Sequence, residues 1–174
     1  MASCQGVAKG IIMKHASGRV VALMIAAIGM DVPAHAACWG AAEVSAAKVR
    51  DLETMLMVSA LRCRAGDPSI LPAYNNLVMQ SRDALTAVND QLRAHFSAGI
   101  GSTAGLNAYD RYVTAIANRY GGGARGLSCA DMASILSAAN AEGGSATGLA
   151  RLASDAGVEP VLDDVECQES FAAR

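Results

Sequence analysis

The chain has 174 residues, of which 52% are hydrophobic and 17% are charged, and its formal net charge at pH 7 is −2. A protein without a basic excess has little to hold the phosphates of a nucleic acid, so we expect no nucleic-acid partner. The length suits one ordinary domain with a hydrophobic core of its own.

Residues 1–36 have the pattern of a secretory signal peptide. Three basic residues precede an apolar run of eleven residues, 20–30, and Ala34-His35-Ala36 follows as an A-x-A cleavage site. The run is shorter than the roughly 18 apolar residues of a membrane span. We therefore predict cleavage near Ala36 and a mature protein that is periplasmic or secreted, touching the membrane only through the leader before cleavage.

Three alternatives concern this leader. Translation from Met13 instead of Met1 would give a compact basic region directly before the apolar run. The leader could also stay uncleaved as an N-terminal anchor. Lipidation of Cys38 is disfavoured, because a lipobox needs an aliphatic residue where His35 stands.

The mature part would have 11 cationic and 15 acidic residues, for a net charge of −4, and four of the five cysteines. An even number of cysteines in an exported protein indicates disulfides, here two. No C-x-x-C pair occurs, which disfavours a zinc site and excludes haem attached through C-x-x-C-H. The four cysteines are Cys38, Cys63, Cys129 and Cys167.

Apolar residues recur at spacings of three and four along most of the mature part, which predicts helices. The second predicted helix is expected to bend or begin afresh near Pro72, and Ser128 with Asp131 resembles a capping box at the start of the fourth. Glycine-containing breaks separate most of the segments. The predicted helices span 41–64, 68–97, 103–120, 128–141 and 145–156.

Two of these helices bear on the candidate site. The first has an apolar stripe through Leu52 and Leu56, which leaves Asp51 and Glu53 on polar faces. The stripe predicted for the third helix consists of Leu106, Tyr109, Val113, Ile116 and Tyr120.

The fold class follows from these helices: an all-α antiparallel bundle of four to five helices at 37–157, stapled by two disulfides, with an acidic tail at 158–174. In an up-down bundle the end of the first helix and the start of the fourth lie together. This favours Cys63–Cys129 and leaves Cys38–Cys167. The pairing Cys38–Cys129 with Cys63–Cys167 stays open if the fourth helix runs the other way.

His95 is the only histidine after the leader, so a His-rich metal site cannot form and a Ser-His-Asp triad would have to use it. We interpret His95 as a boundary residue near a helix C-terminus, where a cation is mildly favoured. A haem ligated by His95 and Met55, Met57 or Met79 is an alternative, although methionines at helical spacing usually fill the core. We expect no metal and no cofactor.

Two further patterns bear on catalysis. The glycine-rich segment 121–126 lacks the preceding strand and the lysine of a phosphate loop, so we interpret it as a connection. Glu43, Glu53 and Glu142 are the candidates for a hydrolase that cuts envelope glycans with two carboxylates. No spacing singles out a pair among them, and no catalytic residue is assigned.

The sequence therefore favours a non-catalytic role as a binding, adaptor, inhibitor or envelope-stress protein, with the glycan hydrolase as the alternative. Trp39 and Tyr112 are the candidate contacts for an unknown protein or envelope partner. Trp39 could instead cover the open end of the bundle, and Tyr112 does not fit the core stripe of its helix. A homodimer stays open, because a bundle seam can also close between two chains.

Overall fold

The computed structural model describes residues 38–162. All regular structure in this range is helical, without a strand, which confirms the all-α prediction. The predicted leader, its alternative start at Met13 and the end of the tail, 163–174, lie outside the described residues. The six helices are α1 (Ala41–Cys63), α2 (Ile70–Gln80), α3 (Arg82–Ser97), α4 (Ser102–Tyr120), α5 (Cys129–Ala141) and α6 (Ala146–Asp155).

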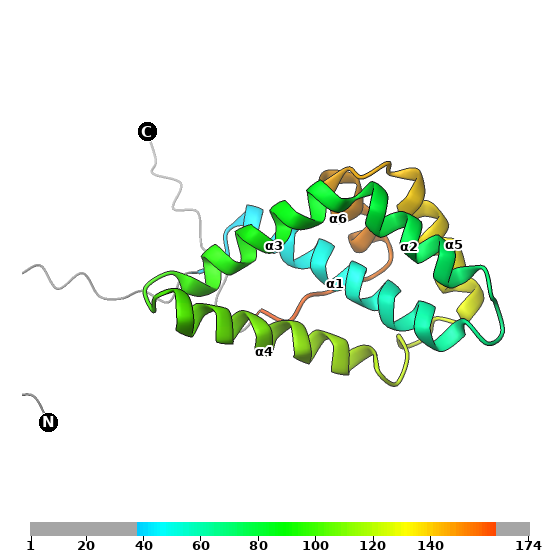
Figure 1. Cartoon of the computed structure of the whole chain (residues 1–174), viewed down its shortest axis with the longest axis horizontal. Coiled ribbons are helices and arrows are strands. Elements are labelled where there is room, and N and C mark those ends of the chain that lie inside the picture. Colours follow the sequence, from blue (N-terminus) through cyan, green and yellow to red (C-terminus); the bar gives the residue numbers. More distant parts are fainter. Residues whose placement is uncertain (1–37, 163–174) are drawn as a thin grey trace, which may run out of the picture. The chain divides into compact units, whose positions relative to one another are not determined.

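Helix α1 is the centre of the fold and contacts each of the other five helices (Figure 1). Six consecutive residues, 51–56, are buried, so this stretch of α1 is enclosed on all sides. The bundle is therefore a central helix wrapped by five shorter ones. The prediction that Asp51 and Glu53 lie on polar outer faces is wrong, because neighbouring helices cover both side chains.

The segment predicted as one helix from residue 68 to 97 is broken at Ser81, between α2 and α3. Pro72 lies in the first turn of α2, where the backbone N–H groups have no partner inside the helix, so the proline is tolerated. Ser81 is fully buried. A Cβ on Gly144, in the connection from α5 to α6, would lie 2.5 Å from the backbone oxygen of Gln80. This glycine therefore lets the α5–α6 connection pack directly against the break.

The start of α5 confirms the predicted capping box. The Ser128 hydroxyl accepts a hydrogen bond from the backbone N–H of Asp131 at 3.2 Å, and the Asp131 carboxylate accepts one from the backbone N–H of Ser128 at 2.8 Å. Hydrogen bonds donated by Ser128 lower the pKa of Asp131. Such a cap fixes the first turn of α5 and with it the position of Cys129, the first residue of the helix.

Helix α4 buries a different stripe from the predicted one. Gly105 faces α3 so closely that a Cβ there would lie 2.4 Å from Cα of Ser97. Because the two backbones meet at this glycine, Leu106 turns outward and is 44% exposed. Tyr112 turns inward and joins Tyr109 and Ile116 in the core.

A disulfide joins Cys63, at the end of α1, to Cys129, at the start of α5, with 5.7 Å between the Cα atoms. This is the pair that the up-down arrangement favoured, and it excludes the alternative pairing with Cys38–Cys129. Cys38 is disulfide-bonded as well. The cysteine predicted to bind it, Cys167, lies outside the described residues, so Cys38–Cys167 stays a prediction. Within the described range, no helix combines the length and the apolar character needed to cross a bilayer.

Candidate functional site

Asp51 is a fully buried acid on α1. The Tyr120 hydroxyl donates a hydrogen bond of 2.5 Å to its Oδ1 atom, and the Arg119 guanidinium pairs with its Oδ2 atom. Burial raises the pKa of the Asp51 carboxyl, and the contacts with Tyr120 and Arg119 oppose that rise. The carboxylate therefore ties the middle of α1 to the last turn of α4.

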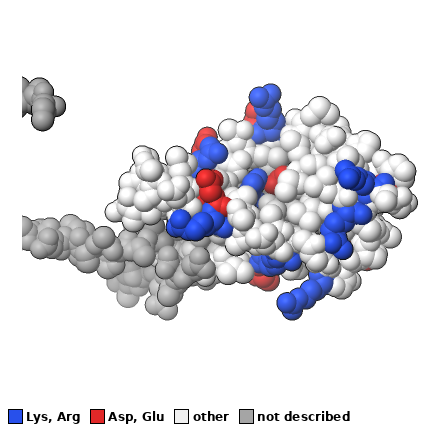
Figure 2. All heavy atoms as spheres, turned by 60° about the horizontal axis from the view of Figure 1, so that its bottom comes forward, with Lys and Arg blue, Asp and Glu red and all other residues white. Residues whose placement is uncertain are grey.

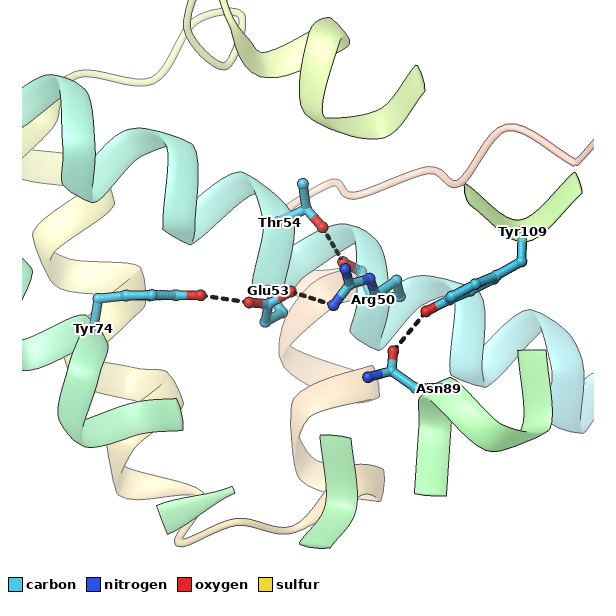
Figure 3. Close-up of polar contacts among 6 residues, drawn as sticks. All are labelled: Arg50, Glu53, Thr54, Tyr74, Asn89 and Tyr109. Atoms are coloured by element: carbon cyan, nitrogen blue, oxygen red, sulfur yellow. Dashed lines mark hydrogen bonds and ion pairs between the residues drawn. The ribbon is translucent and has the colours of Figure 1, made fainter. Parts of the chain in front are cut away.

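Glu53, 8% exposed, is the second buried acid of α1 and turns toward α2 (Figure 3). Its Oε2 atom pairs with the Arg50 guanidinium at 2.9 Å, and its Oε1 atom accepts a hydrogen bond of 2.5 Å from the Tyr74 hydroxyl. Burial first, and then the adjacent Glu53 charge, raise the pKa of Tyr74 above its ordinary value. Tyr74 therefore stays protonated and acts as a donor.

A third polar contact lies on the other side of Arg50. Tyr109 of α4 and Asn89 of α3 point toward one another, and the Tyr109 hydroxyl donates a hydrogen bond of 2.7 Å to the Asn89 side chain (Figure 3). The Thr54 hydroxyl donates to the backbone oxygen of Arg50 at 2.8 Å. Glu53 is therefore joined to α2 through Tyr74, and a separate hydrogen bond beside Arg50 joins α4 to α3.

The three acids named as hydrolase candidates are not brought together. Glu53 lines a space of only about 10 Å³, which is about one water. Glu142 pairs with Arg151 at 3.1 Å, and Glu43 lies 3.4 Å from the side-chain nitrogen of Gln91. No two of the three acids line the same cavity among those described.

The aromatic residues at one end of the fold form a cluster. Trp39 is 3% exposed and packs against His95, in the last turn of α3, with 4.0 Å between ring centroids. Phe96 and Tyr112 lie 5.7 and 6.1 Å from the same indole. Trp39 therefore covers this end of the bundle, and its ring is not presented to solvent.

Tyr112 is 7% exposed, so the interpretation of this residue as a surface contact is wrong. The shift of the α4 stripe at Gly105 turns it into the core. Its hydroxyl is buried without a hydrogen-bond partner. Burial raises the pKa of Tyr112, with the Asp51 charge as the second cause.

Two of the methionines considered as haem ligands differ in their exposure to solvent. Met55 is buried in the core, whereas Met79 is 70% exposed on α2. The rings found against His95 are those of Trp39 and Phe96. Across residues 38–162, no group of three or more His, Cys, Asp or Glu side chains is placed to hold a metal ion.

The glycine-rich segment connects α4 to α5, as expected. The Arg62 guanidinium donates a hydrogen bond of 2.5 Å to the backbone oxygen of Gly121, which holds the connection against the end of α1. Gly123 and Gly126 have positive φ angles of 102° and 74°, which residues other than glycine rarely adopt. The same segment lines a cavity of about 480 Å³ together with Met55 and Arg119.

The described residues also form a groove and a second cavity, each large enough for a small molecule. An open groove of about 640 Å³ lies between the start of α1 and α6, with Lys48 and Arg151 among its lining residues. A smaller cavity of about 340 Å³ lies between the end of α3, the outer part of α4 and the segment after α6. We call the second one the α3–α4 cavity. Its lining residues are Phe96, Ala108, Arg111, Tyr112, Ala115, Ile116, Arg119 and Val161.

No family model, curated protein or solved structure matches this chain. The network of Asp51, Arg119 and Tyr120 was missed by the sequence analysis, because a helical acid on a polar face usually faces solvent. The sequence did contain one signal of burial. Apolar residues occupy every face of α1 in the segment that follows Asp51, which indicates a helix covered on all sides.

Proposed function

We propose that the chain is an exported, non-catalytic binding protein whose ligand enters the α3–α4 cavity. The observation that carries this proposal is the composition of the cavity wall. Phe96, Ile116 and Val161 give it apolar surface, and two arginines supply the charged groups. Ligand sites in proteins are typically concave, mostly apolar and of at least about 300 Å³, with few polar groups.

The buried acids support a binding role by their partners. Both oxygens of Asp51 and both oxygens of Glu53 are engaged by tyrosine or arginine side chains of the same chain. Acids held in this way already bind groups of the chain itself. A glycan hydrolase needs two carboxyl groups on either side of one bond in an open cleft, so we rank that alternative second.

The proposal includes export through the leader and a second disulfide, Cys38–Cys167. Intact mass of protein exported under its own leader, before and after reduction and alkylation, tests both. We expect a mass that begins at Ala37 and lacks about four hydrogens. A retained leader, an added lipid on Cys38 or free thiols at these cysteines would contradict this part of the proposal.

Binding in the cavity is tested with N-phenyl-1-naphthylamine, a neutral probe that fluoresces in apolar sites. We expect the mature protein to enhance its fluorescence, and Ala115→Trp to weaken binding at least tenfold, because the new indole would fill the cavity. Ala115 is exposed on α4, so the variant should fold. The matched control is Thr114→Trp, an exposed neighbour that does not line the cavity.

Two results would count against the proposal. One is no enhancement by the unmodified protein, and the other is equal loss in the two tryptophan variants. The hydrolase alternative has its own readout, the release of reducing ends from purified cell-wall glycan. We expect no release; release that disappears in Glu53→Gln would establish the alternative.

A further inference from the structure

We infer that the ligand of the α3–α4 cavity is a small amphiphile with an anionic head group, held by Arg111 at the head and by the apolar wall along its body. This inference rests on the proposed function and names the class of ligand. It follows from the charges of the lining residues, from the apolar surface between them and from the volume.

The lining residues include two cations and no carboxylate. Arg119 is already engaged, because it pairs with the buried Asp51 and donates to the backbone oxygen of Glu159 at 3.3 Å. Arg111 takes part in none of the ion pairs found within residues 38–162. The cavity therefore has one uncompensated guanidinium, which is suited to bind a carboxylate or phosphate through two parallel hydrogen bonds.

The position of Arg111 on α4 sets how an amphiphile would lie in the cavity. Arg111 and Arg119 are eight residues apart on α4, which is about 12 Å along the helix axis. Ala108, Ala115 and Ile116 lie on the same helix as small or apolar wall residues. A ligand with its head at Arg111 can therefore extend its apolar body along α4 toward the neutralised pair of Arg119 and Asp51.

Part of the apolar wall of the cavity is exposed to solvent in the described part of the chain. Val161, at the edge of the cavity, is 60% exposed. Phe96 closes the α3 side, where its ring packs against Tyr112 with 5.1 Å between centroids. The cavity volume of about 340 Å³ lies within the range of cavities that hold a small molecule.

The surroundings argue against a large polyanion as the occupant. Figure 2 shows the face that brings α4 forward, and on it the Lys and Arg atoms form separate groups on a mainly uncharged surface. A nucleic acid would need a continuous basic stripe. One guanidinium that takes part in no ion pair of the described residues, next to an apolar hollow, fits one anionic group on a small apolar molecule.

The test compares three molecules with the same ten-carbon chain as competitors of N-phenyl-1-naphthylamine: decanoate, decanol and decyltrimethylammonium. The two ions are used below their micelle concentrations and decanol below its solubility limit. We expect decanoate to displace the probe at a concentration about tenfold lower than decanol, with the cation weakest. Raising the salt concentration from 0.05 to 0.5 M should shrink this preference, because the head group is exposed to screening.

The decisive variant is Arg111→Gln, with Arg82→Gln as the matched control. Both arginines are exposed residues of helices, but Arg82 starts α3 and does not line the cavity. We expect Arg111→Gln to abolish the tenfold preference for decanoate and to leave the affinity for decanol unchanged. Arg82→Gln should behave like the unmodified protein.

The outcomes separate this inference from the proposed function. Probe binding with equal competition by decanoate and decanol, or an unchanged preference in Arg111→Gln, would overturn the anionic class and leave the binding role standing. Absence of probe binding would overturn both.

Discussion

Replacing Asp51 with alanine is expected to lower the free energy of unfolding by about 1–3 kcal/mol, the cost of leaving a buried hydrogen-bond donor without its acceptor. The variant removes the acceptor of the buried Tyr120 hydroxyl and the ion-pair partner of Arg119, whose side chain is 32% exposed. Urea unfolding followed by circular dichroism measures the loss. The control is Asp110→Ala, an exposed acid on α4, which should change stability by no more than about 0.5 kcal/mol.

The pH dependence of this effect has a defined sign. Burial raises the pKa of Asp51 in the folded state, so between the two pKa values the folded protein binds this proton more strongly than the unfolded chain. The resulting stabilisation is complete below the unfolded pKa, about 3.9, and is lost as pH rises through the folded pKa. The unmodified protein should therefore gain stability relative to Asp51→Asn as the pH falls from 7 to 4.

The opposite trend would mean that the contacts with Arg119 and Tyr120 outweigh burial and lower the pKa. In that case the carboxylate would be a net stabilising charge at neutral pH. Measuring Asp51→Asn and the unmodified protein side by side removes the titration of other groups from the comparison. The sign of the difference then reports on Asp51 alone.

The helices themselves were predictable from the sequence, because local spacing and caps determine them. Ser128 with Asp131 starts α5, and the glycines after Tyr120 and Ala141 end the helices before them, as the pattern indicated. The break at Ser81 was not predictable in this way. The segment that packs against it contains Gly144, which lies more than sixty residues further along the chain.

The candidate site was less predictable than the fold, for a physical reason. A pattern of apolar residues identifies the face of a helix that packs best, but it cannot show that the remaining faces are covered by other elements. Asp51 and Glu53 have the sequence environment of solvated acids and are buried only because α2 and α4 bring tyrosines and an arginine to them. Tyr112 was misplaced because the register of α4 is set by the close contact at Gly105.

The second large effect is expected from the disulfide. The double variant Cys63→Ala, Cys129→Ala should lose about 4 kcal/mol, because the bridge closes a loop across a sequence separation of 66 residues and so restricts the unfolded chain. Unfolding in urea, with the unmodified protein under oxidising and reducing conditions as the comparison, measures this loss. The slope of the transition should rise in the variant, since its unfolded state can expand further.

The size of that loss decides what holds α5 in place. If the bridge acts mainly on the unfolded chain, the variant should keep its helical circular dichroism in the absence of urea and should still bind N-phenyl-1-naphthylamine. The α3–α4 cavity contains no residue of α5. A loss below about 1 kcal/mol would mean that the contacts of α5 with α1 and α2 and the cap at Ser128 suffice. Loss of helical signal would instead make the covalent link a requirement for the packing of α5 on α1.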